Sequence, residues 1–140
     1  MEGMDRYPSH PARDVSVRSM TAVESGNREG WLSLFTEDSI VVDPIGPSSF
    51  DVEGKGQRGI GAIADFWDNV ISQAPVRFAI RESYAAGNEC ANVGTLTIHL
   101  DGGSHAFVDG VFTYRTDEAG NLLAMRAFWE QEKMRIESPA

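Results

Sequence analysis

The sequence predicts one α+β domain, in which helices pack on one face of a curved, mostly antiparallel sheet. The first half of the chain carries apolar residues at spacings of three and four, which is typical of helices. From Val76 onward, apolar and polar residues alternate between glycine-containing turns, which is typical of strands. Because the helices come first and the strands follow as a meander, the order of elements indicates an α+β fold.

Three helices are predicted in the first half. The first spans about residues 12–25, and its apolar face is made by Ala12, Val15, Ser19, Ala22 and Val23. Asn27 is the N-cap of a short second helix, which carries on one side Trp31, Leu34 and Phe35. A short strand over 39–43 and a Gly-, Ser- and Pro-rich loop over 46–59 come next. The third helix ends before Pro75 and has an apolar stripe of Ile60, Ile63, Trp67, Val70 and Ile71.

The predicted strands after Pro75 cover about residues 76–81, 95–100, 105–115 and 122–134. Glycine-containing turns at 101–103 and 119–121 join the later ones. A length of 140 residues is that of a single domain. We expect this domain to span residues 12–136, with a disordered segment at 1–11 and a loose C-terminus at 137–140.

Composition excludes several classes of function. The formal net charge is −9, so a uniformly basic surface for nucleic acid or for anionic membranes is disfavoured. No apolar run reaches the roughly 18 residues of a membrane span, and the N-terminus does not resemble a secretory signal. Cys90 is the single cysteine, so no internal disulfide can form. We expect a soluble, cytoplasmic domain without nucleic-acid or membrane partners.

Two aspartates stand beside apolar residues in the predicted strands, where an ionised carboxylate without partners is costly to bury. Asp109 shares a strand face with Phe107 and Val111, since side chains two positions apart point the same way. In an apolar site its raised pKa keeps it protonated as a hydrogen-bond donor; the alternative is an arginine partner or exposure to solvent. Asp43 ends an apolar strand next to Pro44, and either acts as a general base or opens an Asp-Pro turn.

Other chemistry-bearing residues predict no site. His10, His99 and His105 lack a spacing that converges on a metal ion. The glycines between residues 54 and 61 lack the preceding strand and following lysine of a phosphate loop. Cys90 has no evident activating base and is expected to be a buried, inert thiol. The sequence therefore predicts neither a metal nor a cofactor.

Several short segments carry a resemblance to a known family. They include the Asp-Pro-Ile-Gly element and the Met-Arg-Ala-Phe-Trp element, and they cover residues 26–30, 34–35, 42–46, 108–112 and 125–129. In this order they resemble the ketosteroid isomerase (steroid delta-isomerase) family, over about residues 15–136. The resemblance implies a SnoaL-like, nuclear transport factor 2-like fold, which is cone-shaped, with three N-terminal helices packed on a curved sheet.

The resemblance also implies roles for individual residues. Asp43, in the Asp-Pro-Ile-Gly element, would be the general base that moves a proton between two carbons. Asp109, kept protonated by an apolar site, would donate a hydrogen bond to the dienolate oxygen. Trp129 matches an aromatic position that lines the pocket near this donor. The residues expected to line an apolar pocket are then Ser19, Phe35, Trp67, Phe107, Val111 and Trp129.

Two features depart from the family. Its second oxyanion donor is a tyrosine on the first helix, and an ungapped alignment places Ser19 there, although a serine hydroxyl is too short to reach as far. Loss of one oxyanion donor typically costs about 10²–10³ in rate. The loop from Gly46 to Gly59 is longer than in the family, and we expect it at the mouth of the cavity.

Three functions stay open on this basis. The first is a ketosteroid isomerase-like enzyme, in which Asp43 moves a double bond into conjugation with a ketone. The second is a polyketide cyclase, dehydratase or epoxide hydrolase-type enzyme, and the third is a protein that binds a small hydrophobic molecule without catalysis. In each case the ligand is steroid-like or polyketide-like. The resemblance also implies a homodimer formed through the outer face of the sheet, where Phe112 and Tyr114 are expected.

Overall fold

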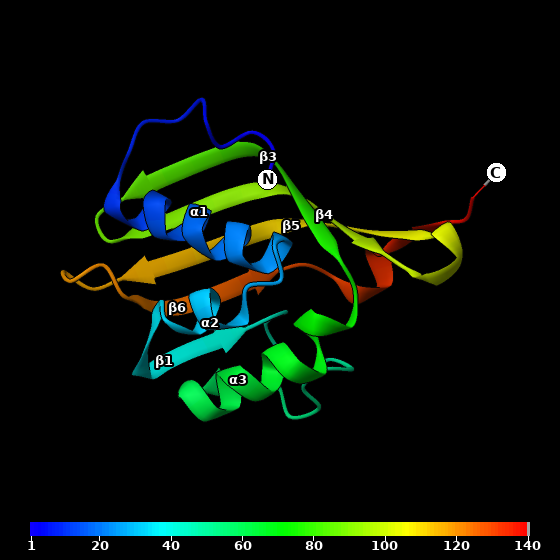
Figure 1. Cartoon of the computed structure of the whole chain (residues 1–140), viewed down its shortest axis with the longest axis horizontal. Helices are drawn as coiled ribbons and strands as arrows, with labels where there is room; N and C mark the ends of the chain where they lie inside the picture. Colours follow the sequence, from blue (N-terminus) through cyan, green and yellow to red (C-terminus); the bar gives the residue numbers. More distant parts are fainter. Residues whose placement is uncertain (140) are drawn as a thin grey trace.

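The structure, a computed structural model that describes residues 1–139, has its helices on one side of a curved sheet (Figure 1). The helices are α1 (Pro11–Glu24), α2 (Arg28–Leu32) and α3 (Ile60–Asn69), and short 3-10 turns are η1 (Ile71–Gln73), η2 (Asp101–Gly103) and η3 (Gln131–Lys133). Asn27 caps α2 as predicted, because its side-chain oxygen accepts the N–H of Gly30 at 2.9 Å.

The strands are β1 (Phe35–Val42), β2 (Gln57–Arg58), β3 (Val76–Ala86), β4 (Glu89–His99), β5 (His105–Thr116), β6 (Leu122–Phe128) and β7 (Arg135–Glu137). They form a sheet of order β2-β1-β6-β5-β4-β3, and β7 pairs with β5 beside this path. All neighbours are antiparallel except β1 and β6, which are parallel. The predicted α+β class with a mostly antiparallel sheet is confirmed.

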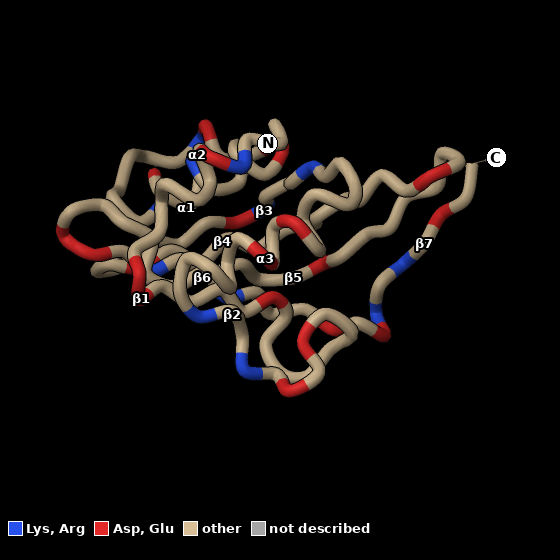
Figure 2. The backbone as a smooth tube through the Cα atoms, turned by 60° about the horizontal axis from the view of Figure 1, so that its bottom comes forward, with Lys and Arg blue, Asp and Glu red and all other residues tan. Residues whose placement is uncertain are grey.

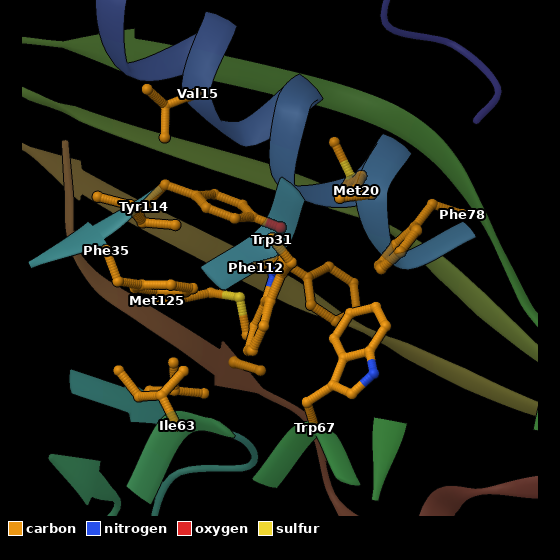
Figure 3. Packing of buried hydrophobic residues seen from close by; sticks show 14 of the residues in the cluster. Val15, Met20, Trp31, Phe35, Ile63, Trp67, Phe78, Phe112, Tyr114 and Met125 are labelled. Atoms are coloured by element: carbon orange, nitrogen blue, oxygen red, sulfur yellow. The ribbon is translucent and has the colours of Figure 1, made fainter. Parts of the chain in front are cut away.

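The hydrophobic core lies between the helices and the inner face of the sheet (Figure 3). Residues from all three helices and from five strands meet there, so burying this surface fixes how the helices pack on the sheet. The residues labelled in Figure 3 are Val15, Met20, Trp31, Phe35, Ile63, Trp67, Phe78, Phe112, Tyr114 and Met125.

Strand β5 turns its even-numbered residues toward the helices. Val108, Phe112 and Tyr114 are buried, whereas the side chain of Asp109 is 48% exposed. The alternation in the sequence groups these residues correctly, but the two faces were predicted the wrong way round. Because Phe112 and Tyr114 belong to the core, they do not lie on the outer face as expected. The homodimer remains a prediction, and the apolar residues Phe112 and Tyr114 no longer support it.

Several strand boundaries differ from the prediction. Strand β3 runs on to Ala86 and β4 begins at Glu89, whereas the predicted strands covered about residues 76–81 and 95–100. Strand β1 begins at Phe35, so Phe35 lies on a strand and not on the second helix. The last long strand ends at Phe128, and the chain then turns through η3 and returns along β5 as β7. At the turn, Gly110 allows a close approach, since a Cβ there would lie 2.6 Å from the Phe128 carbonyl oxygen and 3.0 Å from Trp129 Cβ. The pattern of apolar residues continues through Phe35 and past Phe128, so it does not mark where the pairing between strands changes.

The segment 1–11, which the sequence predicts to be disordered, lies against β3 in the structure. The N–H of Glu2 donates to the carbonyl of Phe78 at 2.9 Å, and the carbonyl of Glu2 accepts the N–H of Ile80 at 2.8 Å. Met4 is buried. Strand β3 is the last strand at its side of the sheet, so this segment satisfies backbone groups that an edge strand leaves open.

The surface charge follows the composition. In Figure 2 Lys and Arg positions are scattered along the backbone, and Asp and Glu are more numerous. Within residues 1–139, no helix is both long enough and apolar enough to cross a membrane.

Candidate functional site

Asp43 directly follows β1, at the sheet edge where the parallel strands β1 and β6 both end. The parallel pairing brings this end beside the end of β6, where Trp129 follows Phe128. The indole N–H of Trp129 donates to Asp43 Oδ1 at 2.7 Å, and the N–H of Ile45 donates to the carbonyl of Ala127 at 3.0 Å. The two strand ends are therefore held together, and the Asp43 carboxyl group is fixed in one orientation.

Burial of this carboxyl group raises the pKa of Asp43, and the hydrogen bond from Trp129 offsets part of the increase. The residue as a whole keeps some accessible surface. A carboxylate in a dry site with one donor is a stronger base than an exposed one, and it remains able to take up a proton. The chain also bends at Asp43-Pro44, so the structure contains both the turn and the buried carboxyl group that the sequence left as alternatives.

Trp129 also lines a cavity of about 420 Å³. The cavity adjoins the stretch of β5 between its pairing with β6 and its pairing with β7. Its lining residues are Ile45, Val108, Asp109, Phe128, Trp129, Glu130, Lys133 and Met134. The volume falls within the range of about 300–1,000 Å³ that is usual for small-molecule pockets. Asp43 does not line this cavity itself, and contacts it through Trp129.

The loop between β1 and β2 lies beside the same cavity. Ile45 contributes to the lining, and the ring of Phe50 lies 6.5 Å from that of Trp129. The side chain of Gln131 donates to the Ser49 hydroxyl at 2.6 Å, which joins the loop to η3. Phe50 is 43% exposed, so an apolar side chain is presented next to the cavity without being covered. The placement agrees with the expectation of a loop at the cavity mouth.

Ser19, Phe35 and Trp67, which were predicted to line a pocket, lie in the interior, and none of them lines the cavity of about 420 Å³. The rings of Phe35 and Trp67 and the hydroxyl of Ser19 all contact Trp31. Trp31 was predicted to lie on a helix but was not assigned to the site. The Trp31 ring lies 4.7 Å from Phe35 and 5.3 Å from Trp67, measured between centroids. The Trp31 N–H donates to the Ser19 hydroxyl at 3.0 Å, and that hydroxyl lies 3.9 Å from the sulfur of Met125.

Asp109 lies on the outer face of β5 and lines the cavity of about 420 Å³, but it is not the protonated donor that the resemblance implied. Its carboxylate accepts hydrogen bonds from the Thr95 hydroxyl at 2.5 Å and from Arg135 Nη1 at 2.7 Å. The hydrogen bond from Thr95 holds the pKa of Asp109 below its usual value, and the charges of Arg135 and Arg81 act in the same direction. The carboxyl group is therefore ionised at neutral pH and cannot donate, which matches the alternative of an arginine partner.

Phe107 and Val111 lie on the same outer face and do not line the interior. The guanidinium of Arg135 stands 5.5 Å from the centre of the Phe107 ring. A signal for this orientation was present in the sequence: the charged residues Asp109 and Arg115 both occupy odd positions of β5, whereas the even positions are uncharged. Charge, rather than apolar content, distinguishes the two faces of this strand.

The residues 1–139 offer no metal site. They contain no group of three or more His, Cys, Asp or Glu side chains placed to hold an ion. His99 and His105 face each other across β4 and β5 with ring centroids 4.9 Å apart. Cys90 is buried and its thiol donates to the side-chain oxygen of Asn92 at 3.3 Å, as expected for an inert thiol.

A family model of the SnoaL-like domain matches residues 17–131. The chain belongs to the SnoaL-like domain family. This SnoaL-like domain is similar to a Delta 5-3-ketosteroid isomerase from Mycobacterium sp., with 35% identity and a TM-score of 0.86 over 92% of this chain and 100% of that chain. The predicted resemblance and the nuclear transport factor 2-like α+β fold are confirmed.

Two further proteins resemble this SnoaL-like domain. RV0760c from Mycobacterium tuberculosis, solved in complex with estradiol-17beta-hemisuccinate, is 34% identical with a TM-score of 0.84, over 91% of this chain and 99% of that chain. An uncharacterized PhzA/B-like protein of Pseudomonas aeruginosa is 25% identical over 123 residues, which are 84% of this chain and 83% of that protein. Members of this group thus include an isomerase and a protein that binds a steroid derivative.

Proposed function

We propose that this SnoaL-like domain binds a flat, apolar, steroid-like ketone and moves a double bond into conjugation with its carbonyl group. The observation that carries the proposal is the buried carboxyl group of Asp43, which burial makes more basic and which Trp129 holds in place. The similarity to a ketosteroid isomerase supports it, and so does the steroid derivative bound to RV0760c.

In this reaction the Asp43 carboxylate removes a proton from the carbon between the ketone and the isolated double bond. The electron pair of the broken C–H bond moves toward the carbonyl group, so its oxygen gains the negative charge of a dienolate. The protonated Asp43 then returns the same proton to the far carbon, and the carbonyl group forms again. No other reactant is consumed, and a buried base suits the step because water does not compete for the proton.

The test is the growth of conjugated-enone absorbance when the protein is mixed with a β,γ-unsaturated 3-ketosteroid. We expect turnover by the natural chain and a loss of about 10²–10⁴-fold in Asp43→Asn, the usual contribution of a general base. Asp38→Asn is the matched control, because it makes the same change at an exposed position on the same strand. Equal turnover by Asp43→Asn and the natural chain would rule out the proposed role.

A second function, binding of the same class of ligand without turnover, is favoured by a separate observation. Neither of the two positions matched to the family's oxyanion donors supplies one. Asp109 is ionised and paired with Arg135, and the Ser19 hydroxyl accepts from Trp31 and donates toward the sulfur of Met125. A titration with estradiol-17beta-hemisuccinate, followed by tryptophan fluorescence, separates the two functions. Saturable binding without any enone formation supports the binding protein, whereas enone formation supports the isomerase.

A further inference from the structure

Tyr114 is a buried tyrosine on the inner face of β5 that none of the sequence predictions assigned to the site. It is 2% exposed, and it packs in the core with Val15, Met20 and Trp31. Figure 3 shows its ring reaching from the strand into the centre of the cluster, with the hydroxyl oxygen pointing toward Trp31. A polar atom is thus placed in the middle of an otherwise apolar interior.

The hydroxyl of Tyr114 has no hydrogen-bond partner among the described residues, although buried tyrosines usually find one. It is not sealed inside the protein either. Gln57 Oε1 is the one side-chain polar atom of residues 1–139 that is both enclosed and without a partner. The Tyr114 oxygen therefore keeps a small accessible surface, although Tyr114 does not line the cavity of about 420 Å³.

The other buried hydroxyl and thiol groups of residues 1–139 are already engaged. They belong to Ser16, Ser19, Ser39, Ser83, Cys90 and Thr116, and each makes a hydrogen bond within the chain. Trp67 is a buried residue whose indole N–H also makes no hydrogen bond within residues 1–139, and like the Tyr114 hydroxyl this N–H is not fully enclosed. Among the hydroxyl groups, only that of Tyr114 is left to serve a ligand.

Two features relate Tyr114 to the reacting region. Burial raises the pKa of Tyr114, and the nearby negative charge of Asp43 raises it further, so the hydroxyl stays protonated and can donate at any working pH. On α1, the position where the family has a tyrosine is occupied by Ser19, whose short side chain is bonded to Trp31. Tyr114 points toward that same tryptophan from the sheet side (Figure 3).

We propose that Tyr114 is the hydrogen-bond donor to the carbonyl oxygen of the bound ketone, supplied by strand β5 in place of helix α1. This inference rests on the proposed function. As Asp43 removes the proton, the carbonyl oxygen becomes negatively charged, and a donor in a dry site stabilises that charge more strongly than the neutral ketone. Because the Tyr114 hydroxyl makes no hydrogen bond within residues 1–139, it can donate to a ligand without first breaking one.

The first test is Tyr114→Phe, which keeps the ring and removes the hydroxyl. We expect kcat for enone formation to fall by about 10²–10³-fold, as for loss of an oxyanion donor. Thermal stability should stay the same or rise, because the variant no longer buries an unpaired hydroxyl. Tyr84→Phe is the control, since Tyr84 is 63% exposed on β3. An unchanged kcat in Tyr114→Phe would overturn the inference.

The second test does not depend on turnover. Estradiol carries a phenol whose oxygen resembles that of the dienolate, and its 3-deoxy analogue lacks that oxygen. We expect the natural chain to bind estradiol more tightly than the analogue, and Tyr114→Phe to lose this preference while still binding both. Loss of the preference in Trp67→Phe alone would assign the donor to Trp67 and overturn the inference, as would a natural chain without any preference.

The two proposals fail in different ways. If the natural chain prefers estradiol through Tyr114 but forms no enone, the proposed isomerisation is wrong and the donor role of Tyr114 stands. If Asp43→Asn abolishes turnover while Tyr114→Phe leaves it intact, the isomerisation stands and the donor role is wrong. If neither steroid binds, both are overturned.

Discussion

Asp43 and Asp109 are both flanked by apolar residues in the sequence, yet the fold places them in opposite environments. Asp43 lies at the end of β1 with one donor, from Trp129, and burial raises its pKa. Asp109 lies on the outer face of β5, where Thr95 and Arg135 hold its pKa below the usual value. Asp43 therefore takes up a proton more readily than an exposed aspartate, whereas Asp109 stays ionised in its contacts with Thr95 and Arg135.

The difference shows that the residues next to an aspartate in the sequence do not determine its burial or its pKa. Alternation in β5 correctly groups Asp109 with Phe107 and Val111, but it does not say which face meets the helices. The partners that decide the ionisation of Asp109 come from β4 and β7, which pair with β5 from both sides. Long-range pairing, rather than local sequence, sets the chemistry of each carboxyl group.

The largest expected effect within this comparison comes from removing the donor to Asp43. Trp129→Phe keeps an aromatic ring and deletes the N–H that lies 2.7 Å from Asp43 Oδ1. A hydrogen bond to a charged group contributes roughly 1.5–3 kcal/mol, which corresponds to a change of about 1–2 in pKa. Because this hydrogen bond lowers the pKa of Asp43, its loss should move the acidic limb of the rate profile to higher pH.

The measurement is enone formation between pH 4 and pH 9. On the acidic limb of the profile, we expect Trp129→Phe to be roughly 10–100-fold less active than the natural chain at the same pH, with the plateau at high pH retained. Tyr84→Phe is the control, since it also deletes one side-chain donor from an aromatic residue, and Tyr84 is 63% exposed on β3. A profile that does not move in Trp129→Phe would show that this hydrogen bond does not set the basicity of Asp43.

An intermediate effect is expected on stability. The folded chain binds a proton at Asp43 more tightly than the unfolded chain does, so ionisation of Asp43 destabilises the fold as pH rises through its folded pKa. Asp43→Asn avoids this cost and still accepts the Trp129 N–H. We expect Asp43→Asn to melt at a higher temperature than the natural chain at pH 7, with the advantage shrinking toward pH 4. A constant difference across this range would contradict the raised pKa.

The smallest effect is expected at Asp109. Its lowered pKa stabilises the fold above the ordinary pKa of an aspartate, and this stabilisation is lost as pH falls through the folded value. Because the pair with Arg135 is about half exposed, Asp109→Asn should cost only about 0–1 kcal/mol at pH 7. Turnover of the ketosteroid should stay within about twofold, since the ionised carboxylate of Asp109 cannot donate a hydrogen bond to the ketone oxygen. A tenfold loss in a steady-state assay would restore Asp109 to the reaction and remove the contrast with Asp43.

Much of the fold was predictable, because it depends on short-range patterns. Helical spacing located α1 and α3, and Asn27 marked the start of α2. The turns at 101–103 and 119–121 fall between strands as expected. Two of the boundaries that were predicted wrongly lie where the same pattern continues through a change of pairing partner, at Phe35 and after Phe128, and the hairpin between β3 and β4 was predicted too short. A period of two describes a strand but does not specify its neighbour.

The candidate site was predictable only in part. Two short motifs singled out Asp43 and Trp129, but their contact was not predicted, and it is the pairing of β1 with β6 that brings them within hydrogen-bond distance. The position of Tyr114 did not follow, because both faces of β5 carry apolar residues. Its uncommitted hydroxyl becomes evident only when every other buried hydroxyl has been matched with a partner.

The sequence by itself determined the α+β class, the order of the elements, the family resemblance and the aspartate that ends β1. These properties depend on residues close together in the chain, whose spacing and turn chemistry act locally. The tertiary structure alone decided which face of β5 is buried, and with it that Asp109 is an exposed ion while Tyr114 lies in the core. The reason is physical: burial and ionisation depend on the strands and helices packed against a residue, which the alternation within its own strand does not encode.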